Sequence, residues 1–148
     1  MRKIGTNGTL KGGGFHHLAF RVQDLDASLK FYIDGLGCRR AYGWGKDARA
    51  EGGTDSRAVM LDTGDGNYLE LFGGGKPADG SPEGVLLHFA LRTTNCDVAL
   101  EAARAAGASV TVEPKTVAID GDAPTEFRVA FVKGPDGEVI EFFQNDML

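Results

Sequence analysis

Two histidines and two glutamates lie at one fixed spacing in this 148-residue chain. His17, in the segment HLAFRVQDLDASL, precedes His88, in the similar segment HFALRTTNCDVAL, by 71 positions. Glu70, in DGNYLELF, precedes Glu141, in DGEVIEFF, by the same 71 positions. Because one offset relates both pairs without a gap, we interpret the chain as two copies of one structural unit.

These four side chains form a ligand set suited to a divalent first-row metal ion. Imidazole nitrogens and carboxylate oxygens bind such ions, and four protein ligands in an octahedral site leave two positions for water or substrate oxygens. Strand alternation gives each of the four strands one apolar face and one face with a central His or Glu. A buried carboxylate without compensation is costly, so we expect a cation beside it. The predicted metal ligands are His17, Glu70, His88 and Glu141.

Each residue taken alone also permits a structural role. His88 is compatible with a hydrogen-bonded core histidine, and Glu70 with an edge strand that faces solvent. Glu141 is compatible with an ion pair to Arg128 or Arg21. Only the repeat, which places all four at equivalent positions, favours metal ligation over these roles.

His16 is the third histidine, and the sequence does not define its role. It shares its parity along the strand with Leu18, so we expect it on the side that packs against the helices. A register slip of one residue would exchange its position with that of His17.

The elements around these residues follow the order β-α-β-β-β in both halves, which predicts an α+β fold of two tandem modules in a mostly antiparallel sheet. We expect a single domain over residues 1–148. Its first module covers about 15–73, a Gly- and Pro-rich linker covers 74–84, and its second module covers about 85–145. The expected strands are 16–22, 38–44, 57–63, 67–72, 86–92, 109–114, 127–133 and 138–143.

Helices are expected between the first and second strand of each module. Asp24 and Asn95 are the predicted N-caps, and glycines end the two helices. Residues 45–56 and 115–126 are expected to be long loops at one end of the sheet, where binding groups often lie.

Composition argues against several classes of partner. The net charge of −5, without a basic stripe, argues against nucleic acid. No apolar run reaches the roughly 20 residues of a membrane span, and no signal segment opens the chain. Cys38 and Cys96 form no disulfide framework. We therefore expect a cytoplasmic protein with reduced thiols and with neither a membrane nor a nucleic-acid partner.

Four segments together resemble the vicinal oxygen chelate superfamily, which includes glyoxalase I, bleomycin-binding proteins and extradiol dioxygenases. They are HHLAFRVQDLDASLKFYIDGLG, LELF, HFALRTTN and PDGEVIEFF, and the resemblance extends roughly from Phe15 to Gln144. It implies that the two modules curve into a cup around one divalent metal ion (Zn, Ni, Mn, Co or Fe). Members are commonly dimers, and exposed sheet edges favour association, so we expect a homodimer.

The ligand pattern is most similar to bacterial glyoxalase I. This similarity implies a lyase or isomerase that moves a proton on a small vicinal-oxygen carbonyl substrate through a metal-bound enediolate. By position, Glu141 is then the catalytic base, Glu70 is its opposite partner, and Arg21 binds substrate.

One position departs from the glyoxalase I pattern. Where an asparagine normally follows the first Glu ligand by four residues, this chain has Gly74, and residues 118–124 (AIDGDAP) are unusually acidic. We therefore expect slow turnover with glutathione. The alternatives are an acyl-thioester epimerase, an extradiol-type dioxygenase and, in another class, a non-catalytic small-molecule binding or resistance protein.

Overall fold

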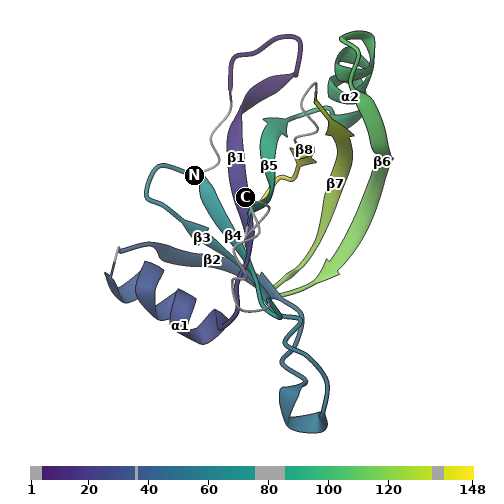
Figure 1. Ribbon diagram of the computed structural model, residues 1–148. Helices are drawn as coiled ribbons and strands as arrows, with labels where there is room; N and C mark the ends of the chain where they lie inside the picture. Colours follow the sequence, from purple (N-terminus) through teal and green to yellow (C-terminus); the bar gives the residue numbers. More distant parts are fainter. Residues whose placement is uncertain (1–4, 36, 76–85, 135–138) are drawn as a thin grey trace.

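The computed structural model describes residues 5–35, 37–75, 86–134 and 139–148. Within these ranges one eight-stranded sheet curls around a common interior, and two α-helices lie on its outer side (Figure 1). The strands are β1 (Gly12–Arg21), β2 (Arg39–Trp44), β3 (Ala58–Asp62), β4 (Tyr68–Phe72), β5 (Leu86–Thr93), β6 (Ser109–Asp120), β7 (Pro124–Lys133) and β8 (Val139–Gln144). The helical segments are α1 (Leu25–Lys30), the π-helical turn η1 (Phe31–Gly35), the 3₁₀ turn η2 (Arg49–Glu51) and α2 (Cys96–Ala105). The predicted α+β fold is confirmed.

The sheet has the strand order β2-β3-β4-β1-β5-β8-β7-β6. The first and last strands of each half are parallel neighbours, β1 with β4 and β5 with β8. The antiparallel pair β1–β5 joins the two halves at the centre of the sheet. Four strands from both halves, β4, β1, β5 and β8, therefore lie side by side.

The hydrogen-bonding register repeats with the offset of 71 seen in the sequence. Ala19 is opposite Glu70 in the first half, and Ala90 is opposite Glu141 in the second. Across the central pair, His17 is opposite Ala90 and Ala19 is opposite His88. Each half thus presents the same residues to the other, as a local twofold axis between β1 and β5 requires.

Both α-helices begin at a side-chain cap. Asp24 Oδ1 accepts a hydrogen bond of 3.0 Å from the Ala27 N–H, and Asn95 Oδ1 accepts one of 3.1 Å from the Val98 N–H. The caps therefore agree with the sequence. The first helix differs from the expectation in its last turn, where η1 replaces α-helical geometry.

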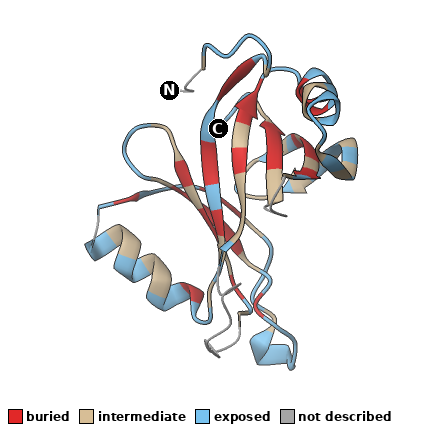
Figure 2. Ribbon diagram, turned by 45° about the horizontal axis from the view of Figure 1, so that its top comes forward, coloured by how far each residue is buried: buried red, intermediate tan, exposed pale blue. Residues whose placement is uncertain are grey.

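Each helix covers its own part of the outer sheet surface. Figure 2 shows that buried residues concentrate on the strands, whereas the helices expose their outer faces. The buried apolar side chains between α1 and the sheet are Leu25, Cys38, Val59, Leu61 and Leu71. Those between α2 and the sheet are Cys96, Ala99, Leu100, Ala130, Val132 and Phe142. This packing fixes the convex side of the strands and directs their other faces into the interior.

The expectation of a long loop at residues 115–126 is wrong. β6 continues to Asp120 and β7 begins at Pro124, so the segment is a β-hairpin with a tight turn. Val117 and Ile119 pack against the inner core and give this half of β6 the alternation of a strand. The loop at 45–56 has the predicted position and contains η2. Most of the predicted linker, residues 76–84, lies outside the described residues.

The hairpin turn contacts the opposite edge of the sheet. Gly121 forms a β-bridge with Trp44 of β2, and the Asp122 N–H donates a hydrogen bond of 2.7 Å to the Gly43 carbonyl. Arg40 makes a bidentate ion pair with Asp122, in which Nη2 lies 2.9 Å from Oδ1. β2 and the β6–β7 hairpin therefore meet, and the curled sheet is closed at one end.

Candidate metal centre

The four predicted ligands converge in the interior of the curled sheet, one from each of its four central strands. One ligand atom from each of His17, Glu70, His88 and Glu141 lies within 4.8 Å of the other three. The side chains are 0 %, 7 %, 12 % and 7 % exposed in that order. The repeat and the parity of the strands thus identified a real cluster, whichever role it has.

The atoms of the cluster are as close as ligands of a common ion. His17 Nε2 lies 3.1 Å from Glu70 Oε2, 2.9 Å from Glu141 Oε2 and 3.1 Å from His88 Nε2. His88 Nε2 lies 2.9 Å from Glu141 Oε2 and 3.5 Å from Glu70 Oε2. Two atoms bonded at about 2.1 Å to one ion lie about 3.0 to 3.4 Å apart at ordinary bond angles. The observed separations match this spacing.

Hydrogen bonding among the described residues leaves the cluster incompletely satisfied. Glu70 Oε2 is buried and has no partner with hydrogen-bond geometry, although an imidazole nitrogen lies 3.1 Å away. Two imidazole nitrogens also face each other directly, and at most one of a neutral pair donates there. Two nitrogens and two carboxylate oxygens with lone pairs toward one point fit a divalent cation.

The carboxylates perturb the protonation of the imidazoles. Burial alone lowers the pKa of His17, but Glu70 and Glu141 outweigh it and raise this pKa to about 10. Burial also lowers the pKa of His88, but Glu141 and Glu70 outweigh this effect, so the pKa of His88 is raised. For Glu70, burial raises the pKa, yet the two imidazoles hold it below its usual range. A proton on either imidazole therefore competes with a cation for the cluster.

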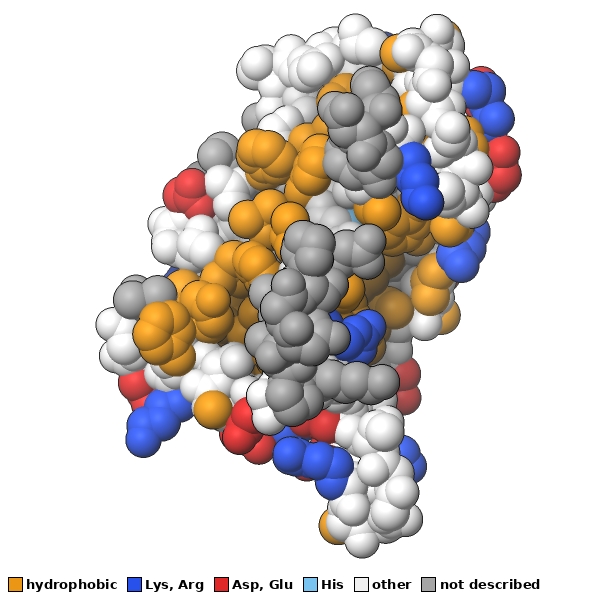
Figure 3. All heavy atoms as spheres, in the orientation of Figure 1, with side chains coloured by type: hydrophobic (Ala, Val, Ile, Leu, Met, Phe, Trp, Pro, Cys, Tyr) orange, Lys and Arg blue, Asp and Glu red, His pale blue; other side chains and the backbone are white. Residues whose placement is uncertain are grey.

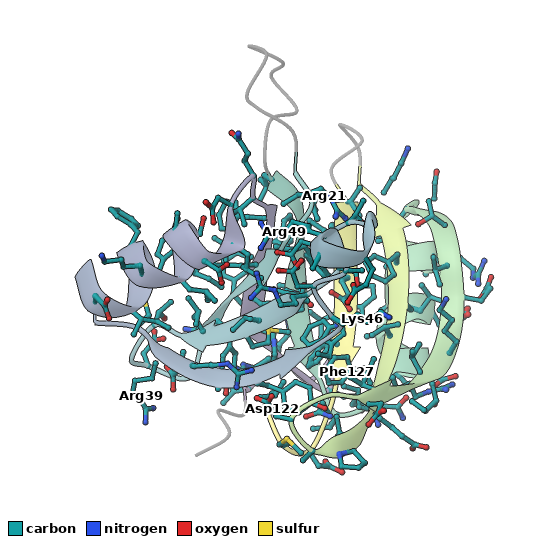
Figure 4. The ribbon with its side chains drawn as sticks, turned by 90° about the horizontal axis from the view of Figure 1, so that it is seen from below. Arg21, Arg39, Lys46, Arg49, Asp122 and Phe127 are labelled. Carbon is teal, nitrogen blue, oxygen red and sulfur yellow. The ribbon has the colours of Figure 1, made fainter. Side chains whose placement is uncertain are left out.

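Apolar and aromatic side chains enclose the cluster. Met60 pairs with Glu70 across β3 and β4, and Phe131 pairs with Glu141 across β7 and β8. The Phe131 ring packs edge-on to His88 at 5.4 Å, and Phe143 packs edge-on to His17 at 5.3 Å. Phe127, between the two arms of the sheet in Figure 4, extends this lining. The surroundings keep water away and strengthen electrostatic interactions within the cluster.

The placement expected for His16 is wrong. A β-bulge interrupts the β1–β5 ladder between Phe15 and His17, so His16 and His17 both turn inward. His16 is 1 % exposed and stacks on Tyr68, whose ring centroid is 5.0 Å away. Its Nδ1 lies 2.8 Å from Nδ1 of His17. Burial and the charges of His17 and Arg92 lower the pKa of His16, which keeps the ring neutral.

The two arginines considered as partners of Glu141 are engaged elsewhere. Arg128 binds Asp97, with nitrogen–oxygen distances of 2.7 and 2.8 Å. Arg21 has an exposed side chain at the end of β1, where Nη1 donates a hydrogen bond of 3.2 Å to the Gly73 carbonyl and the guanidinium lies over the Phe72 ring. Figure 4 labels Arg21 near the end of the curled sheet. The structure therefore does not support an ion pair of Glu141 with either arginine.

Gly74 occupies a position where a side chain would be strained. Its φ is +77°, in the left-handed region that favours glycine. A Cβ at this position would also lie 2.9 Å from the Asp55 carbonyl oxygen. An asparagine here would require the backbone at Gly74 or Asp55 to shift.

Comparison with known proteins agrees with this fold. The Glyoxalase/Bleomycin resistance protein/Dioxygenase superfamily matches residues 14–142, and the chain belongs to this superfamily. A lactoylglutathione lyase of Haemophilus influenzae is 34% identical over 137 residues, which cover 87% of this chain and 90% of that protein. A putative lactoylglutathione lyase of Brassica oleracea is 31% identical over 133 residues, and the match covers 88% of this chain but 44% of that protein.

A solved structure shows the same architecture. Methylmalonyl-CoA epimerase from Mycobacterium tuberculosis superimposes with a TM-score of 0.68 and 20% identity over 95% of this chain and 93% of that chain. The predicted family and its curled sheet are confirmed. No helix in the part of the chain that the structure describes has the length and apolar character needed to cross a membrane.

Proposed function

We propose that the protein is a metal-dependent lyase or isomerase that moves a proton on a small carbonyl compound with two neighbouring oxygens. The observation that carries this proposal is the convergence of two imidazoles and two carboxylates in an apolar interior. A divalent ion (Zn, Ni, Mn, Co or Fe) held by His17, Glu70, His88 and Glu141 would polarise the substrate carbonyl and stabilise negative charge on its oxygen.

Glu141 is the proposed catalytic base. Its Oε2 lies 2.9 Å from Nε2 of both histidines, so the carboxylate is held at the centre of the cluster. It removes the proton from the hydroxyl-bearing carbon beside the carbonyl and returns it to the former carbonyl carbon, while the hydroxyl proton passes to the former carbonyl oxygen. Glu70, its equivalent from the other half, holds the opposite side of the site. Because the His88 side chain is 12 % exposed, solvent can reach this side of the cluster and exchange with the abstracted proton.

Arg21 is the proposed contact for a negatively charged part of the substrate. It follows His17 by four residues along β1, so alternation directs both toward the same face. Its exposed guanidinium is accessible at the end of that strand.

Glutathione is a poor match for this site. Lactoylglutathione lyases are among the relatives, but Gly74 offers no side chain where an asparagine is expected. Loss of one hydrogen bond to a charged group costs about 1.5–3 kcal/mol, roughly 10- to 150-fold in specificity. The acidic turn contributes less repulsion than its composition indicates, because Arg40 neutralises Asp122. We therefore propose slow rather than absent turnover of the glutathione adduct of methylglyoxal.

The experiment is deuterium incorporation measured by NMR in D₂O. Metal-loaded protein is incubated separately with the glutathione hemithioacetal of methylglyoxal, an α-hydroxyketone and an α-branched acyl thioester. Exchange beside the carbonyl that requires both metal and Glu141 supports the proposal, and the preferred compound separates lyase or isomerase from epimerase chemistry. Oxygen consumption with a catechol would instead identify a dioxygenase. Tight binding of these compounds without exchange or turnover would identify a binding protein.

We also propose that the protein is a cytoplasmic homodimer. Phe15, Leu18, Phe31 and Leu86 are large apolar residues that remain exposed. Figure 3 shows hydrophobic side chains gathered on one face of the molecule. Because the two sheet edges meet within one chain, this apolar surface is a better candidate interface than the edges. Light scattering at micromolar concentration would test it, and a monomer mass would reject the dimer.

A further inference from the structure

The contact between His16 and His17 has no counterpart in the second half of the molecule. The two Nδ1 atoms lie 2.8 Å apart, and the rings are nearly perpendicular. The position equivalent to His16, 71 residues later, is Leu87, which offers no hydrogen-bonding group beside His88. An otherwise symmetric pair of histidines is therefore supported differently in its two halves.

The distance between the two Nδ1 atoms indicates that one proton lies between them. Two ring nitrogens at 2.8 Å share a single proton, so one donates and the other accepts. Nε2 of His17 faces the carboxylates and must have a free lone pair to bind a cation. The proton of His17 then lies on Nδ1 and is donated to Nδ1 of His16.

We propose that His16 is a positioning residue that accepts this hydrogen bond and thereby fixes both the tautomer and the ring orientation of His17 toward the metal. The inference rests on the proposed role of His17 as a metal ligand. Ligating histidines commonly donate their second ring nitrogen to a carboxylate, a carbonyl or water, and such partners affect metal affinity about 10- to 100-fold. Here a neutral imidazole fills that role.

Packing holds His16 in the orientation this role requires. Its ring is stacked against Tyr68 and lies 4.1 Å, between centroids, from Phe143. Once Nδ1 accepts, Nε2 carries the remaining proton. Nε2 is buried with no partner in hydrogen-bond geometry among the described residues, although the Leu148 backbone lies nearby. It lines a cavity of about 80 Å³ together with Arg92, Asn145 and Leu148. That cavity has room for a water molecule to accept the proton.

Two substitutions at one position separate hydrogen bonding from packing. His16→Phe keeps an aromatic ring between Tyr68 and Phe143 but removes the acceptor. His16→Asn loses the ring but keeps an oxygen close to the former Nδ1 position. Zinc affinity, measured by competition with a chromogenic chelator, should fall about 10- to 100-fold in the Phe variant. The Asn variant should stay within a few-fold of the parent protein.

A spectroscopic readout tests the tautomer directly. In the zinc-loaded protein with ¹⁵N-labelled histidine, the His17 Nδ1–H should appear as a slowly exchanging proton. It should persist in the Asn variant and exchange rapidly in the Phe variant. Equal loss of affinity in both variants would overturn the inference in favour of a packing role. Unchanged affinity in both would overturn it as well.

The proposed metal site has its own control. His88→Ala should lose zinc whatever His16 does, because it removes a ligand and not a neighbour of a ligand. If that variant kept full zinc affinity, the metal site itself would be rejected. If it lost zinc while His16→Phe bound zinc normally, only the inference about His16 would be rejected.

Discussion

The two halves of the chain match closely in the four central strands of the sheet and differ in the four outer strands. In β1, β4, β5 and β8 the two halves agree in hydrogen-bonding register and in the four His and Glu side chains of the cluster. In the outer strands the halves diverge. β2 and β3 are connected by the long excursion that contains η2, whereas β6 and β7 are connected by a tight turn.

Ion pairs, rather than apolar packing, stabilise this loop between β2 and β3. Arg57 binds Asp55 through distances of 2.8 and 2.9 Å and reaches Asp26 at the start of α1 at 3.0 Å. Arg49 binds Asp47 at 2.7 Å. In the proposed function, the symmetric centre carries the chemistry and the asymmetric periphery shapes access to it. A repeat can preserve its ligands while its loops change, because only the centre requires a fixed geometry.

Removing one member of a symmetric pair should have the largest effect. His17→Ala and His88→Ala should each weaken zinc binding by more than the 10- to 100-fold expected from loss of a neighbouring partner, because a direct ligand is lost and the carboxylates are left facing each other. Chelator competition measures the affinity, and circular dichroism controls for folding. A large loss in one variant alone would show that the two halves are not equivalent in ligation.

Substitution of the two carboxylates, Glu141 and Glu70, should reduce the rate of proton exchange by different amounts. Glu141→Gln should lower proton exchange about 10²- to 10⁴-fold, the contribution typical of a general base. Glu70→Gln should lower it less at saturating metal, because Glu70 is proposed as a ligand opposite the base. Deuterium incorporation in D₂O gives both rates. Equal losses would show that both carboxylates move protons, and a greater loss in the Glu70 variant would exchange their roles.

The sequence predicted the symmetric centre well and the periphery poorly, for physical reasons. Strand alternation and a gap-free repeat are local rules, and they brought His17, Glu70, His88 and Glu141 together correctly. They failed at His16, because a β-bulge depends on the partner strand and leaves no fixed sequence signal. The hairpin turn was missed since a Gly-Asp-rich stretch is equally typical of a loop.

The free energy of unfolding of the metal-free protein should depend on pH, because protonation of the cluster differs between the folded and unfolded states. The pKa of His17 is raised above its unfolded value of about 6.5, so its stabilising effect is complete below that pH and is lost as the pH rises toward about 10. The pKa of Glu70 is lowered, so its contribution is lost as the pH falls below about 4.5. Urea unfolding of the metal-free protein should therefore show maximum stability between about pH 4.5 and about pH 6.5.

The size of the alkaline loss is bounded by linkage. Each pKa unit corresponds to about 1.4 kcal/mol, so the decrease should amount to a few kcal/mol at most. His17→Gln should remove most of the alkaline slope. A stability that did not change between pH 6.5 and 10 would show that the carboxylates do not hold a proton on this imidazole.

The smallest effect is expected where the two outer edges meet. A Cβ on Gly121 would lie 2.5 Å from both the Gly43 carbonyl oxygen and the Tyr42 hydroxyl. Gly121→Ala should therefore push the hairpin turn away from β2 and lower the free energy of unfolding by about 1–3 kcal/mol, as overpacking does. Hydrogen exchange at the Asp122 amide, which is bonded to Gly43, should accelerate. Zinc affinity should change little, because the ligands lie on the central strands.

Arg40→Ala is the matched control at the same junction. It removes the ion pair to Asp122 without adding an atom, and because the two side chains are 48 % and 38 % exposed, the expected cost is below about 1 kcal/mol. Hydrogen exchange at the Asp122 amide should accelerate in both variants, and more in the Gly121 variant. If Gly121→Ala weakened zinc binding tenfold or more, the closed end of the sheet would contribute to the metal site, and the separation between a chemical centre and a periphery that shapes access would fail.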